Sequence, residues 1–353
     1  MDISQIDKNF ALPVINEPDI EWIDARDERF ALYGVYFDET EDAFVRMPSD
    51  VAKATNDGVA ALFRHTSGGR IRFTTDSPYV ALKAVVTKPG VMRNITMIGM
   101  TGFGVYSDGK YLGPIIPDYA AMARTEGGRA GVSGIVRMCS GEHNMEVYMP
   151  LYNGTFSVYI GIKKGSVLKP YRYTDTRRVM YYGSSITQGG CASHPGNDYA
   201  AMLSRMLDID YLNLGFSGSA RGEAVMCDYL ARQECDVFVL DYDHNAPNAK
   251  HLLDTHYPLY ETVRRANPTL PIVMMSRPDF RGDTDSIARR DAIRATYERA
   301  LSEGDSNVYY IDGETLFDGD MRDSCTVDGC HPNDLGFFRM AQVVYPVLKN
   351  ALE

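Results

Sequence analysis

The sequence has no hydrophobic run that approaches the about 18 apolar residues needed for a membrane-spanning helix. Its first residues contain neither the basic start nor the apolar segment of a signal peptide. Basic residues are in deficit, since 36 lysines and arginines stand against 47 aspartates and glutamates, a net charge of −11 at pH 7. A surface of this sign repels nucleic-acid phosphates and anionic lipids. We therefore expect a soluble, cytoplasmic protein that has neither nucleic acid nor a membrane as a partner.

Closely paired cysteines are also missing. The six cysteines are spread along 353 residues and none forms a CxxC motif, so neither a redox centre nor a zinc ribbon is indicated. Cys325, Cys330 and His331 are close in sequence, but no second ligand pair follows at a spacing typical of zinc sites. We expect free thiols, no metal and no cofactor.

The length predicts two domains, and the hydrophobic pattern changes near the middle of the chain. Between about residues 31 and 162, short alternating segments are separated by turn signals such as Asn153-Gly154. This period-two pattern predicts an antiparallel β-sandwich or jelly roll, with strands at 69–77, 79–86, 144–150 and 155–162. The rhythm is interrupted around residues 120–130, where we expect a loop or a short helix.

After a polar connector at residues 165–178, short β-rich segments alternate with longer helical ones. The pattern predicts strands at 179–183, 210–215, 236–241, 271–276 and 307–312, and helices at 199–207, 223–232, 257–266, 286–304 and 336–352. Such alternation is typical of a parallel sheet covered by helices on both faces, whose ligands bind beyond the carboxyl ends of the strands. We therefore predict an accessory β-sandwich with its linker over residues 1–170, and a three-layer α/β domain with a five-stranded parallel sheet over 171–353.

Three polar segments follow the first three of these strands. GSSITQGG (183–190) places a serine in a small-residue turn, and it is neither a G-x-S-x-G elbow nor a phosphate-binding loop. NLGFSGS (213–219) supplies glycines that let backbone N–H groups approach a ligand. LDYDHN (240–245) ends in an asparagine whose amide can donate to an oxyanion, while its two aspartates lack the matching carboxylates of a Mg²⁺ or Ca²⁺ site.

A fourth polar segment, DGCH (328–331), follows the last strand and places an aspartate three residues before a histidine. A turn of this length allows the carboxylate to hold the imidazole. Each segment alone also fits an ordinary turn or the start of a helix. Together they lie at one edge of one sheet and supply a nucleophile, a base, an orienting carboxylate and oxyanion donors, as a serine acyl-transfer site requires.

With these four segments, the chain from about Arg178 to its end resembles the SGNH (GDSL-type) hydrolases, and more narrowly the branch with a G-x-S-x-T first block. The amino-terminal half is similar to the GxDLY-type β-sandwich domain that precedes such catalytic domains. That similarity rests on HTSGGRIRFTTDSP (65–78) and TGFGVY (101–106), in which Gly104 and Val105 stand where aspartate and leucine are usual.

The resemblance implies a role for individual residues. Ser185 matches the nucleophile, His331 the general base and Asp328 the residue that orients the base. The backbone N–H groups of Ser185 and Gly218, with the side-chain amide of Asn245, match the three donors of the oxyanion hole.

The implied activity is that of a serine esterase that cleaves small acyl esters through an acyl-serine intermediate. By analogy with members of this fold that carry a β-sandwich, the expected substrate is a small-molecule or oligosaccharide ester, with acetyl as the acyl group. An acyltransferase with the same triad is an alternative, and a catalytically inactive glycan-binding protein is another. Two residues depart from the family pattern. Asp243 stands where a glycine is usual, and an acidic residue there bears on the charge of the pocket and so on the choice of substrate. Ser184 replaces a usual aspartate. The sequence does not indicate an oligomeric state.

Overall fold

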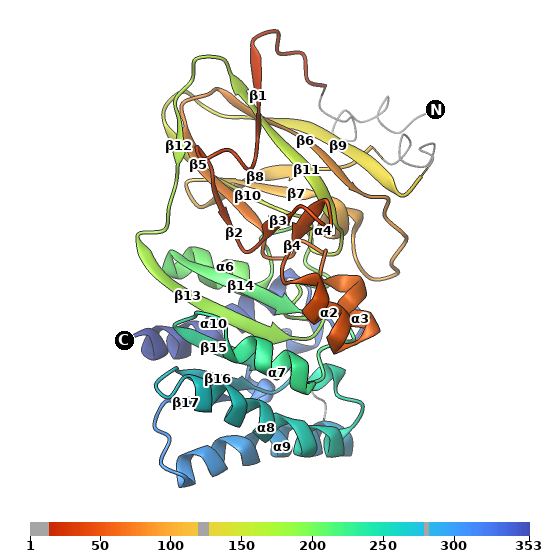
Figure 1. The fold of residues 1–353 in the computed structure, drawn as a ribbon, viewed down its shortest axis with the longest axis vertical. Helices are drawn as coiled ribbons and strands as arrows, with labels where there is room; N and C mark the ends of the chain where they lie inside the picture. The colour runs from red at the N-terminus through yellow and green to blue at the C-terminus, as the bar shows by residue number, and fades with distance from the viewer. Residues whose placement is uncertain (1–13, 119–126, 279–281) are drawn as a thin grey trace.

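Two antiparallel sheets packed face to face form the amino-terminal part of the computed structural model, which describes residues 14–118, 127–278 and 282–353 (Figure 1). In one sheet β1 pairs with β11 beside the order β3-β4-β11-β6-β9; their bounds are β1 (Ile20–Asp24), β3 (Tyr36–Asp38), β4 (Ala43–Val45), β6 (Tyr79–Thr87), β9 (Arg129–Arg137) and β11 (Thr155–Lys163). In the other sheet β2 pairs with β5 beside the order β12-β5-β10-β7-β8; their bounds are β2 (Ala31–Tyr33), β5 (Arg70–Thr75), β7 (Phe103–Ser107), β8 (Lys110–Ile115), β10 (His143–Tyr148) and β12 (Leu168–Pro170). The predicted β-sandwich is thereby confirmed.

Strand alternation directs one face of the second sheet into the sandwich and the other toward the rest of the molecule. In β5, Ile71 and Phe73 belong to the apolar core of the sandwich. Arg70 and Arg72, between and beside them, are also buried, but by the carboxyl-terminal half of the chain. Both faces of β5 are therefore covered.

Three short helices lie in the half for which we predicted only strands and one possible helix, at residues 120–130. They are α2 (Ser49–Thr55), α3 (Asp57–Leu62) and α4 (Met97–Thr101). Val59 of α3 packs with Phe216 and Met226 of the other half. Tertiary packing thus stabilises these short helices, which are too short to show an amphipathic pattern in the sequence. Residues 119–126 lie outside the described part, so the expectation for that segment stays a prediction.

Five parallel strands form the carboxyl-terminal sheet in the order β14-β13-β15-β16-β17, which confirms the predicted α/β fold. The strands are β13 (Asp175–Gly183), β14 (Ile209–Gly215), β15 (Val237–Asp241), β16 (Ile272–Met275) and β17 (Val308–Ile311). One face packs against α6 (Tyr199–Leu207) and α10 (Asp334–Leu352), and the other against α7 (Ala224–Ala231), α8 (Ala249–Ala266) and α9 (Thr284–Ser302). Successive residues of β13 serve the two faces in turn, Tyr181 the first and Tyr182 the second.

Helix α8 begins eight residues before its predicted start. Asn248 caps it, because its side chain accepts a hydrogen bond from the N–H of His251. Pro258 lies inside the helix and interrupts the sequence pattern there. Three short 3-10 turns follow β15 and β17, namely η2 (Asp243–Asn245), η3 (Gly313–Thr315) and η4 (Arg322–Ser324). Within the described residues, no helix has the length and apolar character to cross a membrane.

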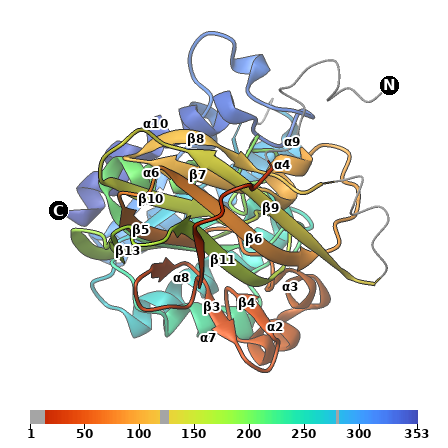
Figure 2. The ribbon, with the colours of Figure 1, turned by 90° about the horizontal axis from the view of Figure 1, so that it is seen from above.

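The β-sandwich covers the edge strand of the parallel sheet (Figures 1 and 2). Arg46 donates hydrogen bonds to the backbone carbonyls of Asn213 (3.0 Å) and Gly215 (2.7 Å) in β14. Arg70 donates to the carbonyl of Tyr211 (3.1 Å) and forms an ion pair with Asp210. These alternate carbonyls of an edge strand have no neighbouring strand to bond to, so buried arginines from the sandwich satisfy them.

Candidate active site

Ser185, His331 and Asp328 meet at the carboxyl edge of the parallel sheet. Ser185 Oγ lies 2.9 Å from His331 Nε2, and His331 Nδ1 lies 2.8 Å from Asp328 Oδ2. A carboxylate at Nδ1 holds the ring proton on that nitrogen, which leaves a lone pair on Nε2 facing the hydroxyl. Residues 146 positions apart in the sequence are thus joined in one hydrogen-bonded chain through which the Ser185 proton can pass to the imidazole.

The turn between η4 and α10 fixes the aspartate and the histidine relative to one another. Asp328 Oδ1 accepts hydrogen bonds from the backbone N–H groups of Cys330 (3.1 Å) and His331 (2.8 Å). Partial burial raises the pKa of Asp328, but hydrogen bonds from the His331 backbone, the Asn94 side chain and the His331 ring outweigh it and hold that pKa well below its ordinary value. The carboxylate is therefore ionised at neutral pH and able to stabilise an imidazolium.

The turn that carries Ser185 is fixed by the two strands beside β13. The N–H of Ser184 donates to the carbonyl of Asp241 at the end of β15 (3.1 Å). On the other side, Asn213 Nδ2 of β14 donates to the carbonyl of Thr187 (2.6 Å). Ser185 itself is only 7% exposed. Hydrogen bonds to the neighbouring strands therefore fix the position of the Ser185 hydroxyl.

The remaining predicted oxyanion donors follow the same flanking strands, Gly218 after β14 and Asn245 in η2 after β15. Gly218 has a φ of +69°, and a Cβ there would meet nothing within 4 Å, so the backbone conformation and not lack of space favours glycine. Asn245 Oδ1 accepts from the N–H of Ala220 (3.2 Å), which fixes the amide and leaves Nδ2 as its donor. The sheet order therefore places the turns of Ser185, Gly218 and Asn245 after three adjacent strands.

Two further carboxyl groups are buried near the carboxyl end of β15, Asp241 in the strand itself and Asp243 in η2. Asp241 Oδ2 accepts hydrogen bonds from Thr187 Oγ1 (3.0 Å) and Tyr199 OH (3.1 Å). Burial, with a smaller contribution from the Asp243 carboxyl, raises the pKa of Asp241 to about 8. Burial also raises the pKa of Asp243 to about 6, although its Oδ2 accepts from the N–H of Arg277 (2.9 Å). Asp243, where the sequence departs from the family pattern, is 1% exposed.

Two residues of the β-sandwich reach this site, and the sequence analysis missed both. Asn94 Nδ2 lies 2.8 Å from Asp328 Oδ2 and 3.4 Å from His331 Nδ1. Tyr152 OH donates to the backbone carbonyl of Ser185 (3.0 Å). Both lie in the half whose pattern predicts strands and turns, and neither belongs to a catalytic motif. The sequence therefore contained no signal that linked them to residues far along the chain.

Cys191, Asp328 and His331 have ligand atoms within 4.8 Å of one another, the one such grouping among the described residues. Both ring nitrogens of His331 already have partners, Ser185 and Asp328. Burial raises the pKa of the Cys191 thiol to about 12, so the thiol is protonated. A metal ion would have to displace these hydrogen bonds and that proton, and we assign none to this group.

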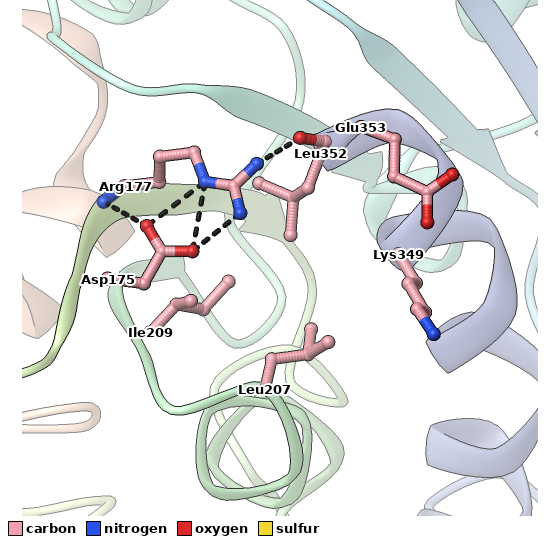
Figure 3. A pocket seen from close by; sticks show the side chains of 7 residues that line it. All are labelled: Asp175, Arg177, Leu207, Ile209, Lys349, Leu352 and Glu353. Atoms are coloured by element: carbon pink, nitrogen blue, oxygen red, sulfur yellow. Dashed lines mark hydrogen bonds and ion pairs between the residues drawn. The ribbon is translucent and has the colours of Figure 1, made fainter.

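A cavity of about 360 Å³ lies at the opposite edge of the sheet (Figure 3). It is lined by the first residues of β13 and β14 and by the end of α10, among them Asp175, Ile209 and Lys349. Arg177 spans it, bonded both to Asp175 and to the carbonyl of Leu352. Because the amino ends of the strands form this cavity, it is separate from the carboxyl edge that carries Ser185.

Comparison with protein families agrees with the two halves of the structure. Residues 176–349 match the model of the GDSL-like lipase/acylhydrolase family. Residues 20–168 match the GxDLY model, the N-terminus of SGNH-hydrolase-type esterases. No curated protein matches the chain. The resemblance predicted from the four motifs and from TGFGVY is thereby confirmed.

Solved structures share the whole architecture. A protein from Bacteroides ovatus described as a GDSL-like lipase is 28% identical, with a TM-score of 0.82 over 94% of this chain and 98% of that one. The salicylyl-acyltransferase SsfX3 of a tetracycline biosynthetic pathway is 18% identical, with a TM-score of 0.77 over 95% of this chain and 98% of that one. A family two carbohydrate esterase from Cellvibrio japonicus is 15% identical, with a TM-score of 0.62 over 94% and 98%. The last two similarities concern the fold alone.

Proposed function

The chain belongs to the SGNH (GDSL-type) hydrolases, an ester-hydrolysing family, and from this we propose that it is a serine esterase that removes small acyl groups, acetyl in particular, from carbohydrates. One observation carries the proposal: the hydrogen-bonded chain from Ser185 through His331 to Asp328, with distances of 2.9 and 2.8 Å. These are the distances at which a proton can be transferred without rearrangement of the site.

In the proposed reaction, Ser185 Oγ attacks the acyl carbon while its proton moves to His331 Nε2. The carbonyl oxygen becomes an oxyanion, which accepts hydrogen bonds from the N–H groups of Ser185 and Gly218 and from Asn245 Nδ2. When the oxyanion collapses, the bond to the alcohol breaks, and the alcohol leaves with the proton from His331. A water molecule then gives a proton to His331 and attacks the carbonyl carbon of the acyl-serine. As the bond between this carbon and Ser185 Oγ breaks, the acid is released and His331 returns the proton to Oγ, which restores the hydroxyl. Asp328 stays ionised throughout and stabilises the imidazolium.

The openness of the site supports a small acyl group on a bulky alcohol. The side chains of His331 and Asp328 are 23% and 33% exposed, so the triad lies near the surface and an oligosaccharide can reach it. Several structures of this fold are named as carbohydrate esterases, one of them from Clostridium thermocellum in complex with cellohexaose. That analogy supports the sugar as the alcohol part of the ester.

An acyltransferase is the second candidate, and the similarity of fold to the salicylyl-acyltransferase favours it. The two activities share the acyl-serine and differ in whether water or another nucleophile takes the acyl group. Reactions with an acetylated oligosaccharide, with and without added alcohol or amine acceptors, separate them. Free acetate as the main product in both cases supports hydrolysis, whereas an acylated acceptor supports transfer.

The first test of the esterase is the Ser185→Ala variant with p-nitrophenyl esters of increasing acyl length and with acetylated oligosaccharides. We expect turnover to fall by a factor on the order of 10⁴ to 10⁶, because the nucleophile is lost while the binding surface is kept. Wild-type protein that prefers acetyl over longer acyl groups supports the substrate assignment. A Ser185→Ala variant as active as wild type contradicts the mechanism.

A further inference from the structure

Asn94 connects the β-sandwich directly to the acid–base pair. It lies in the segment between β6 and α4, and its Nδ2 donates to Asp328 Oδ2 at 2.8 Å. The same nitrogen is 3.4 Å from His331 Nδ1. Asp328 Oδ2 is also the atom that accepts the ring N–H of His331. One carboxylate oxygen is therefore shared between a residue of the sandwich and the histidine.

The segment that carries Asn94 is fixed to the catalytic half on its other side. Its neighbour Ile95 is 8% exposed and packs in the same apolar cluster as Cys191 and Ala192, which follow the nucleophile turn. Thr96 Oγ1 donates to the backbone carbonyl of Ser193 at 3.0 Å. Packing and hydrogen bonding thus hold the position of Asn94 relative to the triad.

An amide donor at the shared oxygen has two physical consequences. First, it fixes the carboxylate of Asp328 from the side opposite its own turn, so that the imidazole is held in line with Ser185 Oγ. Second, it withdraws charge from the oxygen that stabilises the imidazolium, and its N–H dipole faces the ring at 3.4 Å. Both parts of this second effect act against positive charge on the ring, so the Asn94 amide moderates the stabilisation that Asp328 gives to the imidazolium.

We propose that Asn94 is a positioning residue of the active site. Through this residue the β-sandwich contributes to the reaction of the catalytic half. The inference rests on the proposed function, since it assigns Asn94 a role in the same triad. It gives the amino-terminal half a defined task, to set the geometry of the Asp328–His331 pair and the charge that the carboxylate presents to the ring.

Among the described residues, the other titratable and charged groups that interact with this pair, directly or through one neighbour, lie outside the β-sandwich. Cys191, His244 and Cys330 interact with the pair itself, whereas Asp243, Arg277 and Arg289 interact with His244 or Cys330. Burial raises the pKa of Cys191 to about 12 and lowers that of His244 to about 3, so neither changes charge between pH 5 and 8. Asp243 does titrate in this range, but all six groups are the same in every variant of Asn94. A difference between these variants therefore reports on Asn94.

The experiment compares wild type, Asn94→Ala and Asn94→Asp in the full chain, with p-nitrophenyl acetate and an acetylated oligosaccharide from pH 5 to 9. For Asn94→Ala we expect kcat to fall about tenfold, with little change in KM, because a charge-assisted hydrogen bond is lost away from the substrate. We also expect the acid limb of the kcat/KM profile to move up by about half a pH unit. Asn94→Asp replaces the donor by a second carboxylate, so its limb moves further, by about one unit or more.

The matched control is Met92→Ala, an uncharged change at an exposed position two residues earlier in the same segment. We expect it to have the wild-type profile, and thermal unfolding of each variant verifies that the fold is kept. An Asn94→Ala variant with wild-type kcat and an unshifted acid limb overturns the proposal. A lower kcat with an unshifted limb in both Asn94 variants also overturns it, since it makes the role of Asn94 purely structural.

Ser185→Ala separates this inference from the proposed function. If the wild type hydrolyses the esters and Ser185→Ala does not, the esterase assignment stands whatever the Asn94 variants show. If Ser185→Ala is as active as wild type, the esterase mechanism fails, and the proposal for Asn94 fails with it.

Discussion

Asp328 lies in the turn before α10 and Asp241 is the last residue of β15, both at the carboxyl edge of the same sheet, yet their carboxyl groups have opposite surroundings. Asp328 is partly exposed and accepts hydrogen bonds from two backbone N–H groups, an amide and an imidazole, which hold its pKa well below the ordinary value. Asp241 is 1% exposed and accepts only from neutral hydroxyls among its side-chain partners, so burial raises its pKa to about 8.

The difference teaches that the number of donors and access to water, not the residue type, decide what an aspartate does at this edge. An ionised carboxylate beside His331 stabilises positive charge on the ring. A carboxyl group that is largely protonated at neutral pH behaves as a polar anchor, and Asp241 anchors Thr187 and Tyr199. Substitution of each by asparagine keeps the shape and removes the charge, so the same chemical change probes both roles.

The largest effect is expected for Asp328→Asn. The asparagine cannot stabilise the imidazolium and favours the wrong tautomer of His331, so kcat should fall by a factor on the order of 10⁴. Steady-state hydrolysis of p-nitrophenyl acetate measures this, with Asp241→Asn as the matched control. If Asp241→Asn loses as much activity as Asp328→Asn, the two carboxyl groups are not distinct in role.

The second largest effect is expected for Asn245→Ala. This variant tests whether η2, which also carries the buried Asp243, contributes a residue to the reaction. Asn245→Ala removes one donor to the oxyanion, a loss of about 3–4 kcal/mol of transition-state stabilisation, so turnover should fall by roughly two to three orders of magnitude. We expect KM to change little, because the bond strengthens only as the oxyanion forms. A near-wild-type kcat in a folded Asn245→Ala variant would remove Asn245 from the oxyanion hole.

The sequence predicted what depends on local pattern. The alternation in β5 and β6 and the repeated strands and helices after β12 identified both folds, and parallel strands bring the DGCH turn and Ser185 to one edge. Local pattern could not reveal contacts made across the chain, which is why Asn94 and the helices α2 and α3 were missed. Nor could it separate Asp241 from Asp328, because their pKa values are set by burial and donors that only the folded chain supplies.

The smallest effect on activity, and the sharpest on stability, is expected for Asp241→Asn. The folded-state pKa of Asp241 is raised, so the folded protein keeps a proton that the unfolded chain loses above about pH 4. The free energy of unfolding therefore falls as pH rises toward about 8, by up to about 1.4 kcal/mol per pH unit from this group.

Asp328 has a lowered pKa and acts with the opposite sign, since its contribution to stability is lost only as pH falls. Burial raises the pKa of Asp243 to about 6, so this group adds little to the slope above about pH 7, and the comparison is cleanest between about pH 7 and 8. There, denaturant unfolding of Asp241→Asn should show a flatter pH dependence than wild type, with activity close to wild type. If the free energy of unfolding depends on pH equally in Asp241→Asn and in wild type, Asp241 is ionised in the folded protein. The two aspartates would then differ in their access to the substrate and not in their charge.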